Sequence, residues 1–542
     1  MISFSTLSYL DVFLLVVGSW TLYKFTQAVR LRVKTTKLKG PPSSSWIFGV
    51  TKELSNVTKE VSKGDSGALY EQWAKEYGPV YQIPTPLGGR RTILTDPKAV
   101  AHFYSKETFT YVQSNFSKRL IESLLGRGLL WSEGESHRRQ RKTLTPAFSN
   151  AAIRSLTPVF FDSVYKVKAA WDALISSSDT DEAIIDVQKW MNCVSLDSIG
   201  IAGFGHDFGA LQGKRSSVEE VLDSFGTAPP MSMVVMLLGQ VIPILQKLPT
   251  TRGNLMRKLH DTMGGVSEQL LERSRKEKAL GGGVTDTSRS IIGSLLRAEN
   301  ADSELRLTPE EALAQMKVLI LAGYETTSIS LTWALIELSL HPEKQDKLRL
   351  ELAEFTNKDP TYDQLTSGLP YLNSVTREVL RLHPPLAQSG RVAKYDDIIP
   401  LSTPITTTSG KQVDHIAVAQ GSAVFVSIRA INRSEEIWGP DAKEFKPERW
   451  LDNESGLTPK AKEVQGYHHI LSFVDGPRTC LGRAFAIAEF KSVLSVLIRN
   501  YAFSLRDGPE TKIDRVTTLL PRPKVAGEPG YAMPMRVRRF EY

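Results

Sequence analysis

The segment Phe473-Val-Asp-Gly476-Pro-Arg478-Thr-Cys480-Leu-Gly482 constrains this chain more than any other, and it surrounds one of only two cysteines in 542 residues. A cysteine thiolate is a good ligand for a soft metal centre such as haem iron. The glycines let the backbone approach a large flat ligand, and the arginine supplies a fixed cation for a propionate. A lone cysteine in a glycine-rich turn is more often a small buried hydrophobe. The combination of residues nevertheless favours Cys480 as an axial haem ligand.

With Phe473, Gly476, Arg478 and Gly482 placed around Cys480, the segment resembles the cysteine loop of the cytochrome P450 haem-thiolate monooxygenases. The resemblance covers nearly all of the chain after its basic N-terminal region. It implies haem b with an axial thiolate on the iron, and a mainly α-helical domain with a small β region. Length alone would suggest roughly three or four domains, but no linker divides the body of the chain.

We therefore expect three segments: residues 1–24 as a membrane anchor, 25–45 as a basic and Pro/Ser-rich hinge, and 46–542 as the haem-thiolate monooxygenase domain. Two cysteines, Cys193 and Cys480, exclude a disulfide framework and suit a reducing compartment. The net charge is +8, and we find no nucleic-acid motif. Part of the positive charge forms a run just after the apolar N-terminus: Lys24, Arg30, Arg32, Lys34, Lys37 and Lys39.

The N-terminal residues 2–23 are mostly apolar, which predicts a membrane helix. A spanning helix needs roughly 20 apolar residues, so the segment is barely long enough, and Asp11 interrupts it. A cleaved secretory signal would need a charged start and a small-residue cleavage site, and neither is clear here. A helix lying in the interface is a further alternative. We predict a single-pass anchor in the endoplasmic reticulum, with the basic run and the catalytic domain facing the cytosol.

A second informative stretch is Ala322-Gly-Tyr-Glu325-Thr326-Thr327, within an apolar helix predicted to begin at Thr308. A buried carboxylate needs partners, and such local conflicts often mark functional sites. An isolated Glu-Thr pair is commonly a surface glutamate and a threonine bonded to its own helix. Here it resembles the distal acid–alcohol pair of the family. Thr326 would then hold water and dioxygen, Glu325 would help to relay protons, and Gly323 would let the helix open beside the haem.

Glu378 and Arg381 are three residues apart and share one face of a predicted helix. As a surface ion pair they would contribute under about 1 kcal/mol. The resemblance implies a different role, because Phe445-Lys-Pro-Glu-Arg449-Trp450 follows at the distance typical of the family. Arg449 would complete a buried Glu378–Arg381–Arg449 clamp that fixes the core around the cysteine loop.

Three further residues resemble haem-propionate ligands. Arg391 follows the Pro384-Pro385 turn, although an ordinary strand arginine is the alternative. Arg141 lies in the helix after Trp131, where neighbouring basic residues favour a solvated face that could meet an acidic electron donor. His137 stands where the family usually has a tryptophan, and it can still donate a hydrogen bond.

The resemblance implies a monooxygenase that inserts one atom of dioxygen into a lipophilic substrate by hydroxylation or epoxidation. Electrons would come from NADPH through a separate NADPH–cytochrome P450 reductase, because no flavin or nicotinamide fingerprint is present. The style resembles fungal microsomal members that serve secondary metabolism or xenobiotic oxidation. The alternatives are a haem-thiolate isomerase or dehydratase that does not use dioxygen, and a non-catalytic haem-binding membrane protein. Candidate pocket residues, mostly apolar, are 116–130, Ala322, 386–389 and 517–520.

Overall fold

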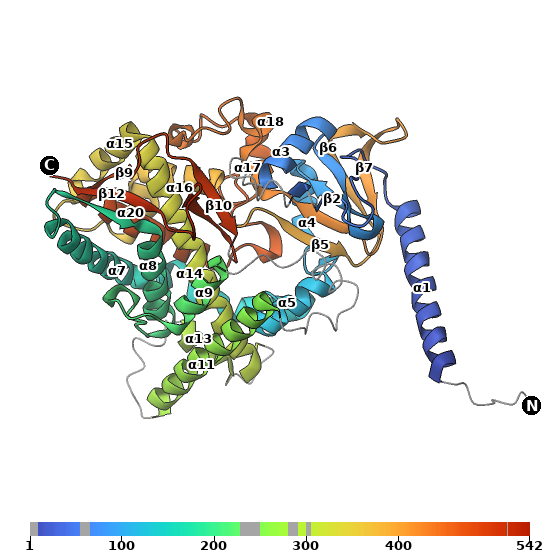
Figure 1. The fold of residues 1–542 in the computed structure, drawn as a ribbon, viewed down its shortest axis with the longest axis horizontal. Helices are drawn as coiled ribbons and strands as arrows, with labels where there is room; N and C mark the ends of the chain where they lie inside the picture. Colours follow the sequence, from blue (N-terminus) through green and yellow to red (C-terminus); the bar gives the residue numbers. More distant parts are fainter. Residues whose placement is uncertain are drawn as a thin grey trace, which may run out of the picture.

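Helices form most of the protein, and small sheets flank them, as Figure 1 shows. The computed structural model describes residues 9–51, 53–54, 66–227, 250–279, 291–299, 305–517 and 519–541. The predicted mainly α fold with a small β region is confirmed. The helices are α1 (Tyr9–Lys34), α3 (Ser66–Tyr77), α4 (Pro97–Ser105), α5 (Asn115–Leu125), α6 (Gly134–Leu144), α7 (Asn150–Ser176), α8 (Val187–Phe204), α9 (Ser217–Thr227), α11 (Thr251–Ala279), α13 (Ile291–Glu299), α14 (Pro309–Leu340), α15 (Pro342–Leu352), α16 (Pro370–Leu382), α17 (Ile428–Arg433), α18 (Glu435–Trp438), α19 (Pro459–Glu463) and α20 (Arg483–Asn500).

The strands form one larger sheet and three small ones. The five-stranded sheet has the order β1-β2-β8-β5-β3, in which β2 and β8 are parallel and the other pairs antiparallel. The remaining sheets are β4-β12-β9, β10-β11 and β6-β7. The bounds are β1 (Val80–Thr85), β2 (Gly89–Leu94), β3 (Tyr111–Val112), β4 (Glu182–Asp186), β5 (Ser389–Ala393), β6 (Asp397–Thr406), β7 (Gln412–Val418), β8 (Ala423–Val426), β9 (Tyr501–Leu505), β10 (Ile513–Thr517), β11 (Pro521–Val525) and β12 (Pro534–Arg539).

Helix α14 is the central helix of the core. Its predicted start is confirmed: Thr308 accepts from the backbone N–H of Glu311 at 3.2 Å, and the Glu311 side chain accepts from the Thr308 N–H at 3.1 Å. This reciprocal capping box satisfies two backbone donors that the first turn leaves unpaired. Among the described residues, α14 alone is long and apolar enough to cross a membrane, but 72% of its most apolar window is buried in the protein. It is therefore a core helix.

Gly323 has a packing role that the sequence did not predict. A Cβ at this position would lie 2.7 Å from Ile199 Cγ1 on α8, closer than atoms of a packed core can approach. Helix α14 is also continuous from Pro309 to Leu340. The expectation that Gly323 lets the helix open beside the haem stays a prediction. Glycine is needed here because α8 and α14 pack closely.

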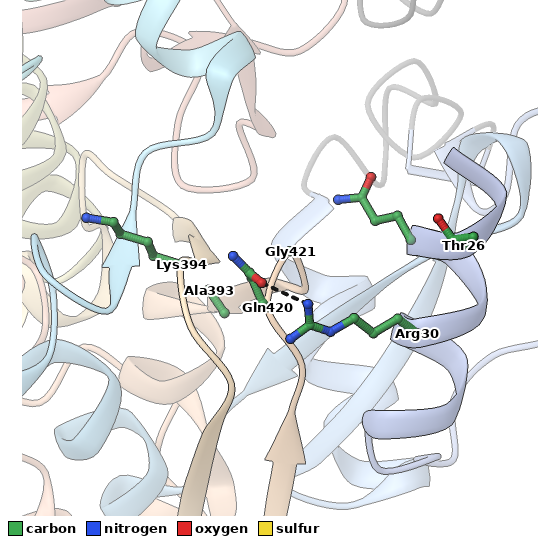
Figure 2. A pocket seen from close by; sticks show the side chains of 7 residues that line it. Thr26, Arg30, Ala393, Lys394, Gln420 and Gly421 are labelled. Carbon is green, nitrogen blue, oxygen red and sulfur yellow. Dashed lines mark hydrogen bonds between the residues drawn. The ribbon is translucent and has the colours of Figure 1, made fainter. Parts of the chain in front are cut away.

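Helix α1 projects from the body on the side of β6 and β7, far from the C-terminus (Figure 1). Its last turns are tied to the loop before β6: Arg30 and Lys34 each lie 3.0 Å from a carboxylate oxygen of Asp396. Arg30 also donates to the side-chain oxygen of Gln420 at 3.0 Å (Figure 2). These contacts are exposed to solvent and screened by salt, so each contributes little to the stability of the fold. The surface hollow between α1 and the body is lined by Thr26, Gln27, Arg30, Ala393, Lys394, Gln420 and Gly421.

The segment expected to be a hinge is partly helical and partly attached to the body. Helix α1 continues through the basic run to Lys34. Beyond it, the backbone N–H of Thr36 donates to Ala417 O at 3.0 Å, and the N–H of Gln82 donates to Lys39 O at 2.9 Å. Residues 1–8 of the predicted anchor lie outside the described part of the chain.

Candidate haem site

The cysteine loop is held in shape by backbone contacts. The N–H of Cys480 donates to Phe473 O at 2.9 Å, and this hydrogen bond joins the first residue of the motif to its cysteine. Gly476 has φ +68, and a Cβ there would lie 2.3 Å from Tyr104 O at the end of α4. Glycine is therefore required at this position for both conformation and close approach. Helix α20 begins directly after the loop, at Arg483.

The Cys480 side chain faces a space inside the protein. Its surface is exposed, yet burial is the largest influence on its thiol and raises the pKa above the ordinary value. An exposed side chain with so much protein around it lines an internal cavity rather than the outer surface. The Gly482 N–H and the Arg141 guanidinium oppose this shift and favour the thiolate. The other cysteine, Cys193, is buried in α8, and burial raises its thiol pKa to about 12.

Two of the predicted propionate ligands carry unsatisfied donors. Arg391 Nε and Arg478 Nε are buried, and the described residues offer neither a hydrogen-bond partner. Their other guanidinium nitrogens reach two acids: Arg391 Nη2 lies 3.0 Å from Glu107 Oε1, and Arg478 Nη2 lies 2.7 Å from Glu133 Oε2. Leaving a buried charged donor unpaired is costly, so these nitrogens fit the carboxylates of a bound haem.

Arg141 and His137 lie together on α6, as expected. Burial lowers the pKa of Arg141, and the positive charges of Arg483 and Arg478 act in the same direction. Burial and the charges of Arg478, Arg141 and Arg391 lower the pKa of His137 to about 3. The imidazole is therefore neutral near pH 7 and carries one N–H donor. The donor set, the interior-facing thiol and the two orphaned nitrogens together fit a haem group.

The three clamp residues form one buried network. Arg381 donates from Nε and Nη2 to the two oxygens of Glu378, both at 2.8 Å, and Arg449 Nε donates to Glu378 Oε1 at 3.0 Å. The backbone N–H of Lys446 and the indole N–H of Trp450 donate to the same carboxylate at 3.0 Å. Burial alone would raise the pKa of Glu378, but Arg381 and Arg449 hold it below the ordinary value. The glutamate is therefore ionised near pH 7.

Hydrogen bonds connect this clamp to the chain before the cysteine loop. Arg381 Nη1 donates to Asn432 O at 2.7 Å. The Asn432 side chain in turn accepts from Leu471 N at 3.1 Å and donates to Ser472 Oγ at 3.0 Å. Ser472 immediately precedes Phe473, and its hydroxyl donates to Leu380 O on α16 at 2.5 Å. The clamp thus positions the residue from which the cysteine loop starts.

Helix α14 presents a different surface at each residue of the distal stretch. Ala322 is exposed although the helix around it is largely buried, so it also borders internal space. The Thr326 hydroxyl donates to Ala322 O at 2.8 Å. Glu325 is 1% exposed, and its Oε1 lies 3.2 Å from Arg522 Nε on β11. Acid and alcohol are therefore neighbours in sequence, but the acid is held by an arginine from the C-terminal region.

The sequence did not identify Arg522, Glu107 or Glu133 as parts of the site. Arg522 lies 197 residues from Glu325, and Glu133 lies 345 residues from Arg478. No local pattern marks such distant partners. One weak signal was present in the sequence. Three arginines and no acid were assigned to a buried site, and this imbalance of charge indicates that acidic partners come from elsewhere in the chain.

The comparisons with known proteins agree with this geometry. The family model of cytochrome P450 matches residues 39–526. The chain is 57% identical over 542 residues to cytochrome P450 monooxygenase claP of Ampulloclitocybe clavipes, covering 99% of both chains. It is 56% identical to claQ of the same fungus, covering 98% of both, and 34% identical to cytochrome P450 monooxygenase 205 of Postia placenta, covering 94% of both.

The interior-facing thiol of Cys480 and the unpaired nitrogens of Arg391 and Arg478 suit a haem-thiolate site, and the chain belongs to the cytochrome P450 family. Its cofactor is haem with a thiolate ligand, and it is an oxidoreductase that incorporates oxygen. The alternatives of a haem-thiolate isomerase and of a non-catalytic haem protein are not favoured.

Replacing Cys480 by serine should abolish the absorption band typical of thiolate-ligated haem in the reduced carbon-monoxide difference spectrum. The hydroxyl of serine is a poor ligand for this iron. Cys193→Ser is the matched control, because Cys193 is buried in α8, and it should keep the band. A normal band in Cys480→Ser would contradict the assignment.

Replacing Glu378 by alanine should give protein without haem. Two buried arginines would lose their counter-charge, which costs roughly 3–5 kcal/mol. The haem-to-protein absorbance ratio of purified protein measures the effect. Glu435→Ala is the control, because Glu435 forms only exposed pairs with Lys443 and Lys75, and it should bind haem normally. Normal haem content in Glu378→Ala would show that the clamp is dispensable.

Proposed function

We propose that this enzyme inserts one oxygen atom into a C–H or C=C bond of a lipophilic substrate and releases the other atom as water. Two electrons come from NADPH through a separate NADPH–cytochrome P450 reductase, and two protons enter through the protein. The observation that carries this proposal is the pair of interior surfaces at Cys480 and Ala322. We infer that both border one cavity, with the thiolate on one side and α14 on the other.

The bound haem supplies the activation of oxygen, and the protein supplies ligation, orientation and protons. Cys480 is the metal ligand, and its loop is preset by the contact with Phe473. Arg141, Arg391 and Arg478 hold the propionates, and neutral His137 adds an N–H donor. These groups would orient a bound haem through its propionates.

Protons reach the cavity along α14. The Thr326 hydroxyl uses its hydrogen on Ala322 O, so its lone pairs are free to accept a hydrogen bond from water. Glu325 carries protons from the far face of α14 when it leaves Arg522. The ion pair keeps this carboxylate in place between turnovers, which limits the entry of water and protons at the wrong time.

The substrate pocket is apolar in its described parts. Leu120, Leu130 and Leu386 expose large side chains, and Leu519 and Leu520 lie partly buried against the core. This lining favours terpenoid, steroid, fatty acyl or aromatic substrates over charged ones. Roles in fungal secondary metabolism or in xenobiotic oxidation both fit such a pocket. Binding spectra across a lipophilic library, followed by reductase-supported turnover, test the substrate class.

We also propose that α1 anchors the enzyme in the endoplasmic reticulum membrane, with the domain in the cytosol. The helix has 26 residues and is about 39 Å long, against about 30 Å of hydrocarbon. Its basic last turns, with Arg30, Arg32 and Lys34, suit the cytosolic interface. Among the described residues, α1 does not reach the mean hydropathy expected of a spanning helix.

Deleting residues 1–24 should move the protein from the membrane fraction to the soluble fraction while it retains haem. Flotation of microsomes through a density gradient measures the distribution. Replacing Arg30, Lys34 and Lys37 by glutamine is the control, since it lowers the charge but keeps the apolar segment, and it should remain in the membrane. Full retention of the truncated chain in membranes would show that other surfaces bind lipid.

Thr326→Ala should uncouple electron use from product formation. Positioned proton transfer contributes roughly 10²–10⁴-fold to such steps, so product per NADPH should fall by about tenfold or more while hydrogen peroxide rises. Thr332→Ala is the control, because Thr332 is buried on the same helix and likewise donates to the carbonyl four residues earlier, Ser328 O, at 2.9 Å. Equal coupling in both variants would remove Thr326 from the mechanism.

A further inference from the structure

Two acidic side chains form ion pairs with arginines that would otherwise bind the haem propionates. Glu107, just after α4, is paired with Arg391 on β5, and Glu133, before α6, is paired with Arg478 in the cysteine loop. Arg141 has no carboxylate partner in the described part of the chain. The site therefore already contains two carboxylates, and a bound haem would add two more. Because like charges repel at close range, the carboxyl group with the weakest stabilisation takes up a proton most easily.

Glu107 is the less well stabilised of these two acids. It is completely buried, and neither of its carboxylate oxygens has a hydrogen bond of good geometry from the described residues. Arg391 is near enough for a charge interaction but not aligned as a donor. Glu133, in contrast, accepts from the backbone N–H of Gln113 at 2.7 Å and from Arg478. A buried carboxylate without aligned donors is the one that most readily takes a proton.

The groups facing Glu107 come from several elements of the fold. Burial raises the pKa of Glu107 to about 7; Arg391 and Arg478 lower it, and Glu133 and Asp475 raise it. Tyr104 on α4 is uncharged, because burial raises its pKa far above the ordinary value. His137 on α6 is neutral for the reason given above. The charged groups around the site are Arg141, Arg391, Arg478 and Arg483 against Glu107, Glu133 and Asp475.

We propose that Glu107 is partly protonated near neutral pH when haem is bound, and that it takes up a proton when the iron is reduced. Two propionates make five carboxylates around four arginines, and protonation of the least stabilised carboxylate relieves the excess negative charge. Reduction adds one further negative charge to the same region. The reduced form then binds the Glu107 proton more tightly than the oxidised form does. This inference rests on the propionate placement proposed above.

The sign of the pH dependence follows from this difference. Because the reduced state binds more protons, the reduction potential falls as pH rises through the two pKa values of Glu107. Without haem the pKa of Glu107 is about 7, and the propionates raise it further. The fall should therefore begin near neutrality and continue on its alkaline side, and the potential should be level at acid pH.

The test is a spectroelectrochemical titration of the holoenzyme at pH values on both sides of neutrality. We expect the wild-type potential to fall with pH, and Glu107→Gln to stay level near the acid value of the wild type. Glu133→Gln is the matched control: it should shift the potential at every pH but keep the slope. A wild-type potential that does not change with pH would overturn the proposal, as would an unchanged slope in Glu107→Gln.

A second measurement needs no variant. Electrochemical reduction of the wild-type holoenzyme in weakly buffered solution should take up a fraction of a proton near and above neutrality, seen with a pH indicator dye. No uptake would overturn the proposal. The carbon-monoxide difference spectrum distinguishes failure of the proposed haem site from failure of the proposed role of Glu107. Absence of the thiolate band in the wild-type protein would refute the haem site itself. A normal band without proton uptake would refute only the role of Glu107.

Discussion

The structure around the haem site depends on one buried carboxylate. Glu378 accepts five hydrogen bonds, from Arg381, Arg449, Trp450 and the backbone of Lys446. In a low-dielectric interior, such a network is stable only when every member is satisfied. Arg381 then extends it to Asn432, whose side chain holds the residues that precede the cysteine loop. The chain that leads into the cysteine loop is therefore positioned by buried charges on α16 and at Arg449.

This arrangement joins segments that are distant in sequence, and the same segments also share an apolar cluster that includes Leu380, Ile431 and Leu471. Helix α16 and the turn at Arg449 contribute the charges, and the loop ending at Ser472 both donates and accepts hydrogen bonds. Apolar packing alone is tolerant of small shifts, whereas bidentate ion pairs fix both distance and angle. Such geometric constraint suits a site where a metal ligand must lie at a defined place.

Local features were predictable from sequence, and distant partners were not. The cap at Thr308 was predicted and is present, since its signal lies within four residues. The closeness of Glu378, Arg381 and Arg449 followed from the resemblance, not from spacing. Gly323 was assigned to the haem, but its neighbour is Ile199 on α8, a tertiary contact that no pattern in α14 encodes. Glu107 and Arg522 were missed for the same reason.

The pairing of Glu325 with Arg522 has a consequence for how this enzyme can change. Arg522 lies on β11, and the backbone N–H of Leu520, just before that strand, also approaches Glu325 Oε1 at 3.4 Å. The same hairpin thus borders the candidate pocket and holds the acid. A substitution that reshapes the hairpin for a new substrate will also alter the grip on the carboxylate. Substrate selectivity and the yield of product per electron therefore depend on the same hairpin. Substitutions in this hairpin among close relatives should change both properties.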